Sequence, residues 1–175
     1  MTALERRAFE FRTEEDGSVL AGVALPYGSK GSVGRFTEEF RAGSLDFAPS
    51  GVFLNVMHVE HRLLARYPEG GLELRDTDKA LELRVRLPDT TEGRDAREMV
   101  KSGVYRGFSV EFRAQKDRWE GTHRIVEKAQ LAAIGLVHAP AYAGATVVAG
   151  AEMRSEKYLA GAASPVRRMR IWRSL

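Results

Sequence analysis

Hydrophobic and polar residues alternate along much of this chain, and the alternation predicts a fold rich in β-strands. The clearest case is a hairpin. Leu72 and Leu74 alternate with polar residues, a turn follows over 76–79, and leucine or valine occupies every second position from 81 to 87. A period of two directs such side chains toward one face of a strand, as in a sheet with one buried face.

Shorter patterns predict the other elements. Strands are expected at 18–28, 51–58 and 106–114, with one or two more between 118 and 142. Phe36 and Phe40 lie four residues apart, and Thr37 is available as an N-cap. This spacing predicts a short helix that ends at Gly43.

An amphipathic helix is predicted within 90–103, where Ala96, Met99 and Val100 recur at helical spacing and Gly103 can end the helix. From position 151 the apolar pattern thins. We therefore predict an α+β, β-rich domain over residues 1–150 and a flexible basic tail over 151–175.

Composition and charge narrow the class of protein. A chain of 175 residues suits one compact domain, and without cysteine neither disulfides nor thiolate chemistry is expected. No apolar run is long enough for a membrane span, and the charged N-terminus lacks the apolar stretch of a signal peptide. The net charge is +3, but residues 151–175 hold six Lys/Arg and two acids, so they contribute +4 and the first 150 residues −1. The near-neutral body does not favour a nucleic-acid-binding domain.

The stretch "RGFSVEFRA" (106–114) places a serine in the middle of a predicted strand. Phe108 and its two apolar alternates would face the core, while Ser109 and Glu111 share the other face. Taken alone, this pattern is typical of an ordinary surface strand.

Histidines offer a second candidate chemistry. His58 and His61 flank Glu60 in "HVEH", but the spacing differs from the helical i, i+4 zinc motif, and in an extended segment the two side chains would point to opposite faces. We therefore expect no metal site. His123, in "EGTHR", is expected to be a turn residue with an ordinary hydrogen bond.

Five segments taken together resemble the tailed-bacteriophage prohead proteases, which are serine proteases of capsid maturation and distant relatives of herpesvirus assemblin. In order between Arg35 and Tyr142 the segments are "RFTEEFRAGSLDF", "NVMHVEHRLLAR", "VRLPDTTEGRDAREMVKSG", "GFSVEF" and "IGLVHAPAY". The resemblance implies an assemblin-like β-barrel with flanking helices, no metal and no cofactor. Ser109 takes the place of the nucleophile, and His58 that of the catalytic histidine.

The third catalytic member is less clear from the motifs. Relatives often carry an acid early in the "i.lv" segment or just before the proline, where this chain has Ala133 and His138. His138 is the favoured candidate, because the herpesvirus branch uses a second histidine in this role, and Glu111 is the alternative. Val59 and Ala65 also depart from the family pattern.

Arg66 and Arg113 are candidates for contact with the oxyanion, although pairing with a carboxylate is the more ordinary role of an exposed arginine.

The resemblance implies a serine endopeptidase that cleaves the scaffolding segment of the major capsid protein, and itself, inside the assembling prohead in the bacterial cytoplasm. Its partners would be the major capsid protein and other copies of the chain. One alternative is a non-catalytic capsid-assembly module, favoured by the departures from the pattern but not by the presence of both Ser109 and His58. Another is nucleic-acid binding by the tail sequence "RRMRIWRSL".

Overall fold

Strands dominate the computed structural model, which describes residues 17–33, 35–138 and 147–149. The described residues contain one helix, α1 (Thr91–Lys101). The strands are β1 (Val19–Pro26), β2 (Gly31–Val33), β3 (Phe36–Phe40), β4 (Leu45–Phe47), β5 (Val52–Val56), β6 (Leu63–Tyr67), β7 (Leu72–Asp76), β8 (Ala80–Arg86), β9 (Gly107–Glu120), β10 (His123–Val137) and β11 (Val147–Ala149). The predicted β-rich α+β class is confirmed, and the predicted tail lies outside the described residues.

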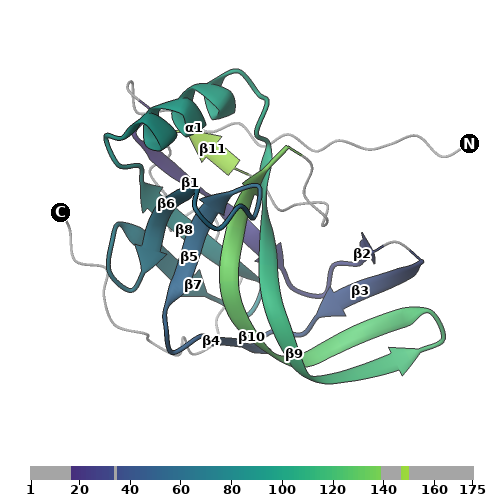
Figure 1. Cartoon of the computed structure of the whole chain (residues 1–175). Coiled ribbons are helices and arrows are strands. Elements are labelled where there is room, and N and C mark those ends of the chain that lie inside the picture. The colour runs from purple at the N-terminus through teal and green to yellow at the C-terminus, as the bar shows by residue number, and fades with distance from the viewer. Residues whose placement is uncertain (1–16, 34, 139–146, 150–175) are drawn as a thin grey trace, which may run out of the picture.

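The strands form two sheets (Figure 1). The smaller sheet has the order β11-β1-β8-β7. The larger one is built around β10, which pairs in parallel with β3, β4 and β5 and antiparallel with β9. The long, curved β9–β10 hairpin runs the length of the molecule and carries the "GFSVEF" segment at the end nearer α1 (Figure 1).

The alternation of hydrophobic and polar residues explains which side chains form the core between the two sheets. In β8 the side chains of Leu81, Leu83 and Val85 are fully buried, as the sequence pattern predicted for the β7–β8 hairpin. Phe108 of β9 and Leu136 of β10 are also fully buried and belong to the same core cluster. The core therefore fixes the face that β9 turns inward.

The predicted helix ending at Gly43 is wrong, because this segment forms β3 and β4. Phe40 is fully buried, and the intervening Glu38 is buried beside Arg124 of β10, with 2.9 Å between Oε2 and Nη1. Two phenylalanines four apart satisfy a period of two as well as a helical turn. Pairing with β10 decided between them, since it supplies a hydrogen-bond ladder and a partner for Glu38.

The helix predicted within 90–103 is confirmed as α1. The Thr90 side chain accepts a hydrogen bond from the Gly93 N–H at 3.2 Å, and Gly103 follows the helix with a φ of 74°. No helix among the described residues has the length and apolar character needed to cross a membrane.

The expected closed barrel is not present among the described residues. The strands follow a barrel-like circuit, but β6 and β7 form no ladder with each other, and an isolated bridge joins Arg66 of β6 to Gly71, the residue before β7. β1 lies beside β9 without forming a ladder with it. The reason is that β1 pairs with β8 along one edge and with β11 along part of the other, at Leu20–Gly22. The resemblance also implied several flanking helices, whereas the described part of the chain contains one, α1.

Candidate active site

Ser109 lies on the face of β9 that points away from the core. Its neighbour Phe108 is fully buried, and Val110 packs against the core cluster from the same inward face. Ser109 itself is half-buried, and its register partner on β10 is Gly135. A hydroxyl in mid-strand is therefore held at a fixed position on an outer, partly open face of the sheet.

His58 follows β5 in a tight loop rather than ending the strand as predicted. Met57 and His58 have φ values of 55° and 56°, which are uncommon for residues other than glycine. Backbone hydrogen bonds of 3.0 Å join the Met57 N–H to the Leu136 oxygen and the Val56 N–H to the Arg62 oxygen. This loop reverses the chain and brings the His58 side chain back over the sheet.

The His58 ring lies against the backbone of β10 at Gly135. A Cβ atom added to Gly135 would lie 2.7 Å from His58 Nε2, 2.8 Å from Cε1 and 2.9 Å from Cδ2. Since Gly135 is also the register partner of Ser109, the fold brings the two predicted catalytic residues to the same position on the sheet. The motifs did not identify Gly135, although a glycine inside an apolar strand often marks a close approach.

Glu111 lies on the other side of the His58 ring. Its Oε2 is 3.5 Å from His58 Nδ1, a nitrogen that is buried and has no hydrogen bond among the described residues. Glu111 pairs in register with Ala133, the position at which relatives can carry an acid. A carboxylate of β9 thus approaches the far nitrogen of the histidine ring, on the strand face that also carries Ser109.

His138 is exposed and lies directly after the end of β10. Within the described residues it forms no side-chain hydrogen bond or ion pair that would link it to His58. Ser109 and His58 are not hydrogen-bonded to each other either. Such bonds are often long in a free enzyme and tighten when substrate binds.

The two arginines considered for the oxyanion differ in their surroundings. Arg66 of β6 donates from Nη2 to the Ser50 carbonyl oxygen at 2.8 Å, and its guanidinium lies 5.7 Å from the centre of the Phe53 ring. Arg113 is exposed on β9 and shares the strand face of Ser109. Arg66 is thus already engaged, whereas Arg113 is open to solvent.

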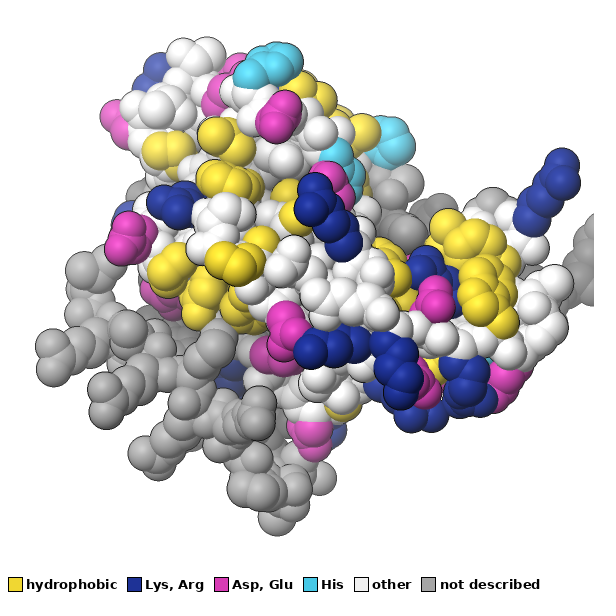
Figure 2. Space-filling view, turned by 60° about the horizontal axis from the view of Figure 1, so that its bottom comes forward, with side chains coloured by type: hydrophobic (Ala, Val, Ile, Leu, Met, Phe, Trp, Pro, Cys, Tyr) yellow, Lys and Arg dark blue, Asp and Glu magenta, His cyan; other side chains and the backbone are white. Residues whose placement is uncertain are grey.

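The other histidines have separate surroundings. His61 is exposed in the loop after β5, and His123 begins β10, where Nδ1 lies 2.9 Å from Thr37 Oγ1 and Nε2 3.3 Å from Glu39. The described ranges contain no group of three or more metal-ligating side chains. Figure 2 shows histidine side chains gathered at one end of the viewed face with acidic side chains beside them, while lysines and arginines gather toward the other end.

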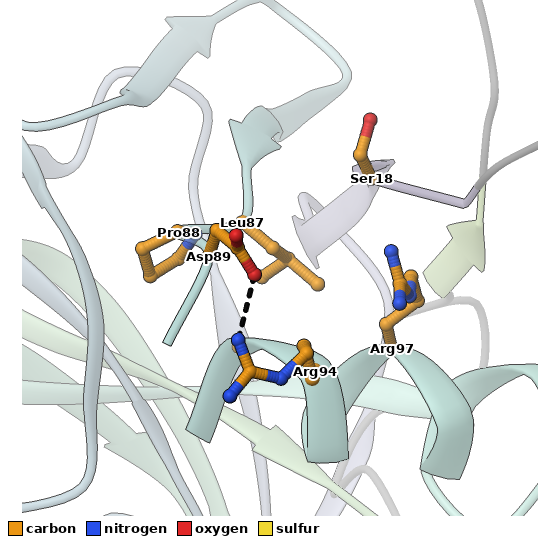
Figure 3. A pocket seen from close by; sticks show the side chains of 7 residues that line it. Ser18, Leu87, Pro88, Asp89, Arg94 and Arg97 are labelled. Carbon is orange, nitrogen blue, oxygen red and sulfur yellow. Dashed lines mark hydrogen bonds and ion pairs between the residues drawn. The ribbon is translucent and has the colours of Figure 1, made fainter. Parts of the chain in front are cut away.

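The two cavities near α1 are not lined by the candidate catalytic residues. A small cavity of about 90 Å³ lies between the end of β8 and α1, where Asp89 and Arg94 form an ion pair at 2.7 Å (Figure 3). A larger cavity of about 350 Å³ is lined by Arg62, Met99 and Tyr105 among others, on the α1 side of the His58 loop. Ser109 and His58 line neither cavity, and both are partly exposed to solvent.

A serine on a rigid strand, a histidine ring beside it and a carboxylate at the far ring nitrogen are the parts of a serine hydrolase that activates its nucleophile through a base. The chain belongs to the caudovirus prohead serine protease family, whose family model matches residues 3–159. The resemblance predicted from the motifs is thereby confirmed. Neither a search of curated proteins nor a search of solved structures found a match.

Proposed function

We propose that this chain is the serine endopeptidase of phage capsid maturation, which cleaves the scaffolding segment of the major capsid protein and itself within the assembling prohead. The observation that carries the proposal is the position of the His58 ring over Gly135, the register partner of Ser109. Family membership supports the protease class and the capsid setting. The open face around Ser109 suits an extended polypeptide substrate.

In the proposed mechanism, Ser109 Oγ attacks the scissile carbonyl carbon while His58 Nε2 accepts the hydroxyl proton. The imidazolium then gives that proton to the leaving amine, which leaves an acyl-enzyme that water hydrolyses. Glu111 acts at Nδ1, where a carboxylate holds the ring orientation and stabilises the positive charge as it forms. No metal or cofactor takes part in these steps.

Glu111 is our proposed third member, and His138, favoured by the motifs, is the alternative. The 3.5 Å separation between Glu111 Oε2 and His58 Nδ1 supports Glu111. The alternative requires the exposed His138 to approach the same nitrogen. Glu111→Gln should slow cleavage by about 10²–10⁴-fold, the range associated with acid–base groups, and His138→Ala should have little effect. The opposite ranking would assign the third role to His138.

Two structural expectations accompany this function. We propose that the open circuit of strands is a variant of the assemblin-like barrel, and that residues 1–150 form the protease domain. Residues 151–175 would be a basic tail that recruits the protease into the prohead. Self-association and contact with the scaffolding segment are further parts of the proposal.

The proposed function is tested by co-expressing the chain with the capsid protein of its own phage. We expect an N-terminally trimmed capsid subunit with the wild-type chain and an untrimmed one with Ser109→Ala. The matched control is Ser32→Ala, which removes the exposed serine of strand β2, far in sequence from both predicted catalytic residues. Equal trimming by Ser109→Ala would instead favour a non-catalytic assembly module.

A further inference from the structure

We propose that Gly135 is a positioning residue for His58: its missing side chain leaves the space in which the imidazole must lie to serve Ser109. The inference rests on the proposed function for its catalytic consequence, but its structural part can be tested without any cleavage. It explains why position 135 holds a glycine, which neither the motifs nor the regular strand geometry requires.

The backbone of Gly135 does not itself call for glycine. The residue lies inside β10, paired in register with Asn55 on one side and Ser109 on the other, and its φ is outside the left-handed range. Glycine inside a strand lowers stability, because it loses more conformational freedom on folding and has no side chain to pack. The gain must therefore come from the space above its Cα atom.

That space is filled by the His58 ring. A Cβ atom at residue 135 would approach three ring atoms to 2.7–2.9 Å, closer than carbon atoms in contact, which lie about 3.5–4.0 Å apart. The Nε2 atom is the nearest of the three. A methyl group would thus meet the ring nitrogen that is proposed to accept the Ser109 proton.

The His58 backbone cannot easily yield to such a methyl group. The hydrogen bond from the Met57 N–H to the Leu136 oxygen ties the loop to β10 next to Gly135, and Met57 and His58 already have strained positive φ values. The side chain has to rotate instead. Rotation would move Nε2 away from Ser109 and Nδ1 away from Glu111 together.

The first test uses protein stability to ask whether a side chain at position 135 would clash with the His58 ring. Gly135→Ala, His58→Ala and the double variant are compared by urea denaturation of the full chain. We expect Gly135→Ala to lower the denaturation midpoint in the wild-type background and to raise it, or leave it unchanged, in the His58→Ala background. The double variant should fold even if the single Gly135→Ala variant does not. An equal fall in the denaturation midpoint in both backgrounds would show that the methyl group clashes with a group other than His58, and would overturn the proposal.

The second test measures the catalytic consequence with an alkyl fluorophosphonate. Ser109 Oγ attacks phosphorus, fluoride leaves, and the hydroxyl proton passes to His58, so labelling reports the Ser–His pair without a peptide substrate. We expect Gly135→Ala to reduce the maximal labelling rate by about 100-fold, the loss typical of a displacement of about 1 Å, with the half-saturating reagent concentration unchanged. A folded Gly135→Ala chain labelled at the wild-type rate would overturn the proposal.

Ile134→Val is the matched control for the labelling test. Ile134 is the adjacent residue of β10, is fully buried on the opposite face and belongs to the core cluster. Its substitution should lower stability modestly and leave labelling unchanged. If labelling falls with stability in both variants, Gly135 acts only through folding and the proposal fails. Absence of labelling in the wild-type chain would refute the proposed function, while the denaturation test would still decide the position of His58.

Discussion

The two halves of β9 differ in sequence pattern and in surroundings, since hydrophobic and polar residues alternate in the first half but not in the second. In the first half, Gly107–Phe112, one face packs on the core and the other carries Ser109 and Glu111. In the second half, residues 113–120, every residue is exposed. Near the start of the second half, Gln115 has no register partner between the pairs Ala114–Ala129 and Lys116–Lys128. Such a bulge bends a strand and separates the two regions.

Different forces hold the two halves. Burial of Phe108 fixes the first half, whereas Trp119 in the second half packs edge-on against Phe36 with ring centres 5.2 Å apart and remains half exposed. Charged contacts such as Lys116 to Glu127, at 2.8 Å, add to the second half. The comparison teaches that a polar face supports a precise site only where the opposite face of the same strand is fixed by a core.

The largest effect on activity is expected from substitution of His58, the histidine beside the first half of β9. His58→Ala should reduce trimming of the capsid protein by about 10⁴-fold, because it removes the proposed base while leaving the strand intact. His61→Ala is the control, because His61 is exposed in the same loop and should be dispensable. A greater loss with His61→Ala would contradict the assignment of His58.

Phe108→Ala should cause the largest loss of stability along β9. The side chain is fully buried in the main core, so its truncation should lower the free energy of unfolding by about 3–5 kcal/mol. Urea denaturation measures the change. A loss below about 1 kcal/mol would mean that the first half of β9 is not fixed by the core in the way the comparison requires.

Trp119→Ala should cost much less, although it removes a larger side chain. Since half of this residue is exposed and its ring packs edge-on against Phe36, we expect the free energy of unfolding to fall by about 1 kcal/mol and capsid trimming to stay normal. A loss as large as that of Phe108→Ala would show that the second half is as tightly packed as the first.

The smallest effect is expected for Lys116→Met. The hydrogen bond from Lys116 holds the pKa of Glu127 below its ordinary value, with Arg41 and Arg118 contributing to the same direction. Removing the ammonium group should raise this pKa toward that of a free glutamate, as carbon NMR of the carboxyl group would detect. A carboxyl with a lowered pKa stabilises the fold above its unfolded pKa and loses this effect as the pH falls through its folded pKa. The variant should therefore show a weaker fall in stability in acid, and an unchanged Glu127 titration would contradict the assigned cause.

Much of the fold follows from the sequence alone. The β7–β8 hairpin, α1 and the inward face of β9 were predicted because their periodicity is carried by residues next to one another in the chain. The order of the five segments identified the family, and with it Ser109 and His58 as candidates.

Only the tertiary structure decided how the parts of the site meet. Residues 36–40 form a strand because they pair with β10. The loop after β5 directs His58 back over the sheet. There its ring lies against Gly135, with Glu111 near the far ring nitrogen. The sequence places Ser109 and Glu111 on one face of the same strand, but it could not show that the His58 ring, from the loop after β5, would approach Glu111 and the register partner of Ser109. The physical reason is that periodicity sets which face a side chain takes, while the register between strands distant in sequence is set by packing of the whole core.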